Sequence, residues 1–177
     1  MVLSYPDLEV AEVGAVERTV DFPYVPGLLS FRESPVILAA YGKLKVAPDL
    51  ILVDGQGIAH PRRFGIASHL GVLLGVPTVG CAKSLLCGAH GPLAAARGST
   101  SEIEHEGEVI GMAVRTRDGV RPVYVSIGHM VNLAAAVSWV SSCCRGYRLP
   151  EPTRLAHQAA SGHLPEPEHP ARRSGRP

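Results

Sequence analysis

Apolar and polar positions alternate in short blocks along this chain, and the first blocks predict two strands and a helix. Residues 1–10 and 13–22 carry loosely alternating apolar positions, which predict two strands joined by a short turn. Ser30 is followed three residues later by Glu33, a spacing that matches a capping box with Ser30 as the N-cap. We therefore expect a helix from Ser30 to about Lys43.

The rest of the chain continues this alternation of strands and helices. The run Leu-Ile-Leu-Val at 50–53 is continuous and apolar, which is typical of a parallel strand buried on both faces. The elements predicted after the first helix are a strand at 50–53, a helix at 63–74, a strand at 78–81, a loop over 88–107, strands at 108–116 and 121–127, and a helix at 131–144. This order indicates one α/β domain with a mixed sheet.

Composition narrows the classes of function. The 177 residues are 46% hydrophobic, enough for one domain with a real core, and the net charge of +1 means that any nucleic-acid surface must be a local patch. The four cysteines form no C-x-x-C pair, so we expect reduced packing residues rather than a zinc ribbon.

No apolar run reaches the length of a membrane span and no signal-peptide pattern is visible, so we expect a cytoplasmic protein without membrane contact. Prolines and terminal basic residues predict a poorly ordered tail from about Ser161.

The densest group of chemically active side chains follows the apolar run at 50–53. Asp54 stands where that strand should end, and open α/β sheets bind ligands at the carboxyl ends of their strands. A carboxylate there must be solvated, paired or bound to a metal, because burying it bare is costly. Gly55 and Gly57 would let the backbone approach a flat ligand closely. The cationic donors that follow are His60, Arg62, Arg63 and Lys83.

On the residues alone, two interpretations of Asp54 stay open. With a second carboxylate, Glu33, and several cationic groups, it suits magnesium-assisted phosphodiester hydrolysis, since Mg²⁺ takes only one or two protein carboxylates. The alternative is that Asp54 and Gly55 are merely a turn after a strand. A nucleotide-handling enzyme is disfavoured, because the chain has no G-x-x-x-x-G-K-[ST] motif and no G-x-G-x-x-G after a strand.

Five longer motifs occur in order along residues 1–158. They are PYVPGLLSFRE, VDGQGIAHPRRFGIASHLG, GCAKS, VSIGH and RLPEPTRLAH. In this order and spacing they closely resemble the endonuclease V family, deoxyinosine-directed nucleases of the ribonuclease H-like superfamily. The resemblance implies a catalytic domain over 1–158 with a mixed central sheet flanked by helices. From composition, we expect the remaining residues 159–177 to be a disordered tail.

The activity that this resemblance implies is DNA repair. Family members hydrolyse the second phosphodiester bond 3′ of deoxyinosine with Mg²⁺, and leave 3′-hydroxyl and 5′-phosphate ends. Mn²⁺ is an alternative metal, and some members prefer inosine in RNA. The expected partner is therefore DNA that contains deaminated bases, or inosine RNA, bound by a monomer.

Residue by residue, the resemblance also implies an active site. Asp54 and Glu33 match metal-site carboxylates, and His157 matches a histidine near the metal and the attacking water. Lys83 matches the lysine that contacts the scissile phosphate, and His60 a histidine close to the catalytic centre.

The same resemblance implies how an inosine would be held. Tyr24, between two prolines, matches the wedge that fills the gap left by the rotated base; stacking there recovers roughly 1–3 kcal/mol. Arg62 matches an arginine near the centre. The positions that match the lining of the base pocket are Gly27, Leu29, Gly55, Gly57, Gly65, Gly80 and, nearby, Leu86.

One departure from the family pattern matters. The family's first metal carboxylate lies on an N-terminal central strand in a Gly-Val-Asp-like context, and no residue of this chain matches it. We therefore expect that the first, central strand of the sheet is missing from this chain. We also expect that the chain is either poorly soluble or inactive, or very weakly active, on inosine-containing DNA. The rival function is a catalytically impaired protein that binds inosine-containing nucleic acid without cutting it.

Overall fold

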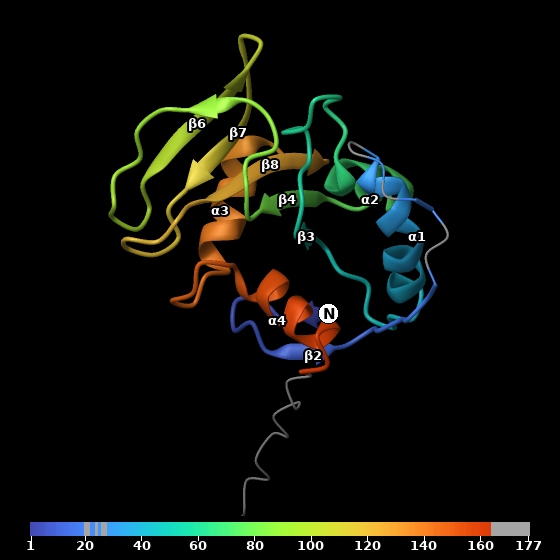
Figure 1. Ribbon diagram of the computed structural model, residues 1–177. Helices are drawn as coiled ribbons and strands as arrows, with labels where there is room; N and C mark the ends of the chain where they lie inside the picture. The colour runs from blue at the N-terminus through green and yellow to red at the C-terminus, as the bar shows by residue number, and fades with distance from the viewer. Residues whose placement is uncertain (20–21, 24, 26–27, 164–177) are drawn as a thin grey trace, which may run out of the picture.

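A six-stranded sheet with helices on both faces forms the centre of the molecule (Figure 1). The structure is a computed structural model that describes residues 1–19, 22, 23, 25 and 28–163. Its strands are β1 (Val2–Leu3), β2 (Val10–Glu12), β3 (Ile51–Val53), β4 (Thr78–Ala82), β5 (Ala89–His90), β6 (Thr100–His105), β7 (Glu108–Val114) and β8 (Val123–His129). Its helices are α1 (Leu29–Tyr41), α2 (Ile66–Leu74), α3 (Leu133–Ser142) and α4 (Glu151–Ala160).

The main sheet has the strand order β3-β4-β8-β7-β6-β5. β3 and β4 are parallel, with Ile51 opposite Thr78, and all other neighbours in this sheet are antiparallel. β1 and β2 form a separate antiparallel pair. Within the part of the chain that the structure describes, β3 is hydrogen-bonded to β4 alone. The sheet is therefore mixed and flanked by helices, which confirms the α/β class that the sequence predicts.

The alternation of β4 directs its side chains to two different helices. Val79 and Cys81 are fully buried and pack in one cluster with Val140 of α3. Thr78 faces the other way, and its hydroxyl donates to the carbonyl of Ala67 in α2 at 2.7 Å. Because successive side chains of a strand point to opposite faces, α2 and α3 cover opposite faces of the sheet.

Two predicted helix starts are wrong. α1 begins at Leu29 after Leu28, which makes no side-chain cap, so Ser30 is a buried residue inside the helix and the predicted capping box with Glu33 does not form. The helix predicted from residue 63 begins at Ile66. Arg63 has a φ of 53°, in the left-handed region, and a right-handed helix cannot include that conformation.

The predicted loop over 88–107 contains strands β5 and β6. In β6 Ile103 is fully buried between the exposed residues Glu102 and Glu104, and one buried position is too short a pattern to indicate a strand. The sequence also predicts no helix at 151–160, where α4 forms with a proline in its first turn. That position suits proline, because the first amide groups of a helix have no partner within it. The predicted tail lies largely outside the described residues.

At its N-terminal end the chain is fastened to the α1–β3 connection by Glu12. Its carboxylate accepts the backbone N–H groups of Lys45 at 2.9 Å and Val46 at 2.9 Å. These hydrogen bonds lower the pKa of Glu12 below its usual value of 4.5, and the bond from Val46 has the larger effect. A carboxyl whose pKa is lower in the folded state than in the unfolded state stabilises the fold at pH values above its unfolded-state pKa. This stabilisation is lost as the pH falls through its folded-state pKa.

We therefore expect Glu12→Gln to lower the melting temperature at neutral pH, with a difference that shrinks as the pH falls below about 4.5. Thermal unfolding followed by circular dichroism across this range measures it. Glu17→Gln removes an exposed carboxylate of the segment after β2 and is the matched control. A Glu12→Gln deficit that stays constant into acid, or that equals the control's, would show that the carboxylate charge does not fasten this segment.

Candidate active site

Asp54 and Lys83 meet where two parallel strands end. Asp54 directly follows β3 and Lys83 directly follows β4, so both leave the same edge of the sheet. The Lys83 Nζ lies 2.5 Å from the Asp54 Oδ2. The side chains remain 38% and 34% exposed, so this pair contributes less than about 1 kcal/mol to stability. It is an accessible carboxylate–ammonium pair at the edge where α/β sheets bind ligands.

Glu33 brings a second carboxylate towards this edge from α1. It is partly buried. Burial raises its pKa, the negative charge of Asp54 raises it further, and Arg32 partly opposes both. The two carboxylates are therefore close enough to repel each other, and a cation between them would relieve that repulsion.

These donors fit a hard divalent cation. Among the residues that the structure describes, no three His, Cys, Asp or Glu side chains form a metal-binding group, so a site built from several histidine and cysteine ligands has no support there. Two carboxylates near one another at an open edge suit Mg²⁺, which keeps several of its waters and takes only one or two protein carboxylates. Asp54 and Glu33 are the residues that could hold it.

The loop after Asp54 is pressed against the sheet at its glycines. A Cβ added to Gly57 would lie 1.9 Å from the carbonyl oxygen of Ile127, and one on Gly80 would lie 2.4 Å from the amide nitrogen of Gly57. Gly55 and Gly65 are similarly crowded, by Ile66 and by the Gln56 carbonyl. The Gly57 amide also donates to the Ser126 hydroxyl at 2.9 Å. Close packing is thus sufficient reason for these glycines, and their predicted place in a base pocket stays a prediction.

His60 lies in the same loop and is buried. Burial and, secondarily, the positive charge of Arg62 lower its pKa. Its Nδ1 accepts the backbone N–H of Arg62 at 3.1 Å, so the proton of the neutral ring belongs on Nε2. His60 is therefore a neutral imidazole at neutral pH, with one ring nitrogen already committed to shaping the loop.

Two residues that the sequence did not single out hold the segment that carries Lys83. Gln56 donates from Nε2 to the carbonyl of Ser84 at 2.9 Å, and Arg148 donates from Nη2 to the carbonyl of Lys83 at 2.5 Å. Gln56 is buried and Arg148 is partly buried. Because these bonds fix consecutive carbonyl groups, they restrain the backbone from which the Lys83 ammonium reaches Asp54.

The remaining predicted site residues lie on other elements than Asp54 and Lys83. His157 is exposed on α4, a helix that contacts β3. Leu29 is the first residue of α1, and Leu86 is exposed in the segment after β4. Tyr24 and Gly27 lie outside the described residues, so their predicted roles stay predictions.

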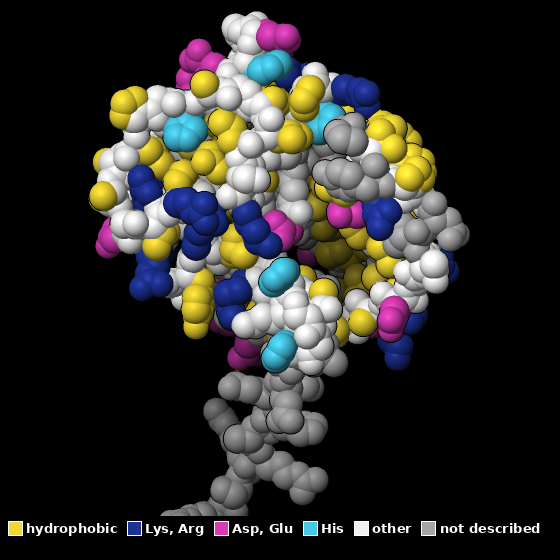
Figure 2. Space-filling model, viewed as in Figure 1, with side chains coloured by type: hydrophobic (Ala, Val, Ile, Leu, Met, Phe, Trp, Pro, Cys, Tyr) yellow, Lys and Arg dark blue, Asp and Glu magenta, His cyan; other side chains and the backbone are white. Residues whose placement is uncertain are grey.

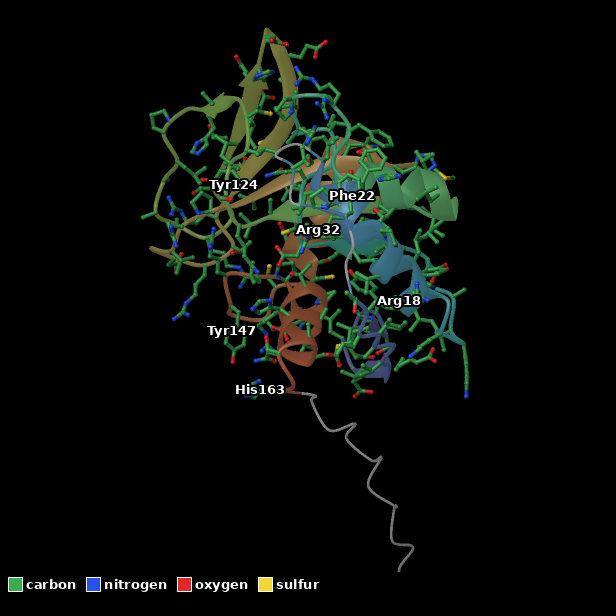
Figure 3. All side chains as sticks on the ribbon, turned by 45° about the vertical axis from the view of Figure 1, so that its right-hand side comes forward. Arg18, Phe22, Arg32, Tyr124, Tyr147 and His163 are labelled. Carbon is green, nitrogen blue, oxygen red and sulfur yellow. The ribbon has the colours of Figure 1, made fainter. Side chains whose placement is uncertain are left out.

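The segment before α1 is tied to that helix by Arg32, whose Nη1 donates to the Phe22 carbonyl at 2.6 Å. Figure 3 shows Phe22 and Arg32 close together at the upper end of α1. The rings of Phe22 and Phe31 stack with centroids 6.4 Å apart, and His69 lies 5.1 Å from Phe31. Phe22, Phe31 and His69 thus form a row of aromatic rings beside the start of α1, which no pattern in the sequence predicts.

Comparison with known proteins places this geometry in a family. The family model described as Endonuclease V matches residues 1–158. A relative named Endonuclease V from Gloeobacter violaceus is 65% identical over 158 residues, which cover 89% of this chain and 64% of that protein. One from a Roseiflexus species is 56% identical over 166 residues, covering 93% of this chain and 75% of the relative. The chain thus spans 64% of the length of the first relative.

Solved structures of the same family are also similar to this chain. Human ENDOV superposes with a TM-score of 0.85 at 39% identity, covering 91% of this chain and 74% of that one. Endonuclease V of Ciona intestinalis, solved with a 24mer DNA that contains an inosine followed by a ribo-adenosine, gives a TM-score of 0.77 at 31% identity, covering 90% and 75%. These matches confirm the mixed sheet and its flanking helices. Among the described residues, no helix is long and apolar enough to cross a bilayer.

Proposed function

Because the chain belongs to the Endonuclease V family, we propose that it is a DNA repair endonuclease for deaminated adenine. Its reaction is hydrolysis of the second phosphodiester bond 3′ of deoxyinosine with Mg²⁺, leaving 3′-hydroxyl and 5′-phosphate ends. The observation that supports this most directly is the meeting of Asp54 and Lys83, with Glu33 close by, at the shared edge of β3 and β4.

In this mechanism Asp54 and Glu33 would hold the divalent cation. A bound Mg²⁺ would polarise a phosphoryl oxygen and lower the pKa of a water. Lys83 places its ammonium beside the same carboxylate, where it can pair with a non-bridging oxygen of the scissile phosphate once substrate arrives. His157, exposed on α4, is the group we assign to the attacking water.

For the substrate we propose an inosine rotated out of its stack. An enzyme that inspects one base must extract it, which costs a few kcal/mol and is easiest at a mismatched base. Tyr24 fills the vacancy, and the glycine-rich backbone around Gly57 and Gly80 receives the base. The assignment of the base to this backbone rests on the resemblance to the family. The close approaches at Gly57 and Gly80 hold the loop against the sheet at that place.

The experiment is cleavage of a labelled duplex with one deoxyinosine, compared with the same duplex carrying adenine. With Mg²⁺ we expect any nick to fall at the second bond 3′ of the inosine and to form slowly, because no residue of this chain matches the family's first metal carboxylate. Chelation of the metal should stop it. Ligation of the 5′ end and extension of the 3′ end identify the termini. Tight inosine-specific binding without any nick would contradict hydrolysis and favour the rival function of a binding protein; a matching RNA duplex tests the preference for ribonucleotides.

A further inference from the structure

Basic side chains gather beside the proposed site. Figure 2 shows Lys and Arg side chains clustered next to the acidic side chain at the centre of this face, over the connections that follow β7 and α3. Arg121 and Arg148 lie in these connections. Arg148 is hydrogen-bonded to the carbonyls of Arg121 and of Lys83. The net charge of the whole chain is only +1, so this gathering is a local feature.

Arg148 is fixed in place by main-chain groups. Its Nε donates to the Arg121 carbonyl at 2.9 Å, and its Nη2 donates to the carbonyls of Pro122 at 2.7 Å and Lys83 at 2.5 Å. These acceptors are neutral, so they orient the guanidinium without cancelling its charge. Arg148 therefore joins the turn before β8 to the segment that carries Lys83, and remains a cation at that junction.

Arg121 adds a second positive charge next to it. Burial lowers the pKa of Arg148, and the nearby charge of Arg121 lowers it further. Arg121 is exposed. Asp54 is the carboxylate whose charge reaches Arg148, and it is already paired with Lys83. Two like charges held together in this way attract an anion.

We propose that Lys83, Arg148 and Arg121 form a basic track that binds successive phosphates of the nucleic-acid strand leading away from the scissile bond. The direction of the track rests on the proposed function, which places the scissile phosphate at Lys83. The ligand is the phosphodiester backbone and not a base, because guanidinium groups pair with phosphate oxygens without reading sequence. The track positions the strand and adds affinity that weakens with salt.

The test is the salt dependence of binding, measured by fluorescence anisotropy with the full chain. The probes are a fluorescein-labelled oligodeoxynucleotide with one deoxyinosine and the same strand with adenine. Arg121→Ala should lower the slope of log affinity against log salt by about 0.7–0.9, the value for one phosphate contact. Both probes should lose affinity equally. Arg121→Lys, which keeps the charge, should keep the slope.

Arg18→Ala is the matched control. Arg18 is also exposed, and in Figure 3 it lies on the other side of the molecule from Tyr147, the residue that precedes Arg148. An Arg121→Ala slope equal to that of Arg18→Ala would overturn the track, as would a loss of affinity confined to the inosine probe. A reduced slope on both probes, in a chain that never cleaves deoxyinosine, would support the track and contradict the proposed function instead.

Discussion

Replacing Asp54 with alanine is expected to reduce cleavage of deoxyinosine-containing DNA by more than about 100-fold. Loss of a residue that only orients a metal ligand costs up to about 100-fold in activity, and loss of a direct ligand should cost more. The fold should survive, because the carboxylate is accessible and its bond to Lys83 is a partly exposed ion pair. The rate is measured on the same duplex and at the same Mg²⁺ concentration as the unsubstituted chain. Burial, the larger cause of the raised pKa of Glu33, remains in this variant, but loss of the Asp54 charge should lower that pKa in part.

A second measurement separates metal binding from chemistry. Mg²⁺ should raise the melting temperature of the unsubstituted chain, since a ligand that binds the folded state stabilises it, and should do so much less for Asp54→Ala. Asp49→Ala removes an exposed carboxylate just before β3 and is the matched control for both measurements. If Asp54→Ala keeps its cleavage rate and its response to Mg²⁺, Asp54 is merely a turn residue after a strand, and the proposed metal site is wrong.

The position of Asp54 was predictable because it depends on local sequence. A short continuous apolar run ends at that residue, and the rule that ligands bind at the carboxyl ends of strands needs no coordinates. The capping box failed for the opposite reason. Ser30 and Glu33 have the right spacing, but the helix begins one residue before Ser30, and Ser30 is buried within it. Burial decides between a capping serine and a packed one, and a local pattern does not contain that information.

The residues that hold the Lys83 segment could not be predicted from a pattern at all. Gln56 and Arg148 act on carbonyl groups that lie 28 and 65 positions away in the chain. A carbonyl acceptor has no signature in the sequence, so only the folded chain shows that these side chains converge. Sequence reasoning therefore finds groups that chemistry requires by type, such as carboxylates, and misses groups whose function is to orient them.

Glycine in the loop after Asp54 can be required either for base recognition or for packing, and the two explanations predict different effects of substitution. If Gly57 served only to admit a base, an added methyl group would disturb recognition and leave the fold intact. The structure instead places that methyl group 1.9 Å from the Ile127 carbonyl. The backbone cannot easily withdraw, because the Gly57 amide donates to Ser126 and the Ile58 amide donates to the same Ile127 carbonyl at 2.8 Å.

Gly57→Ala is therefore expected to destabilise the fold by about 3 kcal/mol or more, at or beyond the upper end for overpacked substitutions. For a chain of this size the melting temperature should fall by about 6–12 °C or further, as thermal unfolding would show. Gly42→Ala is the matched control: Gly42 has a helical φ of −63° at the end of α1, and its added Cβ meets nothing closer than 3.5 Å, so stability should hold or rise slightly. A Gly57→Ala chain that melts like the Gly42→Ala chain but no longer distinguishes deoxyinosine from adenine would show that recognition, and not packing, requires glycine there. Failure of the Gly57→Ala chain alone to fold would show that the fold requires this loop to lie flat against β8.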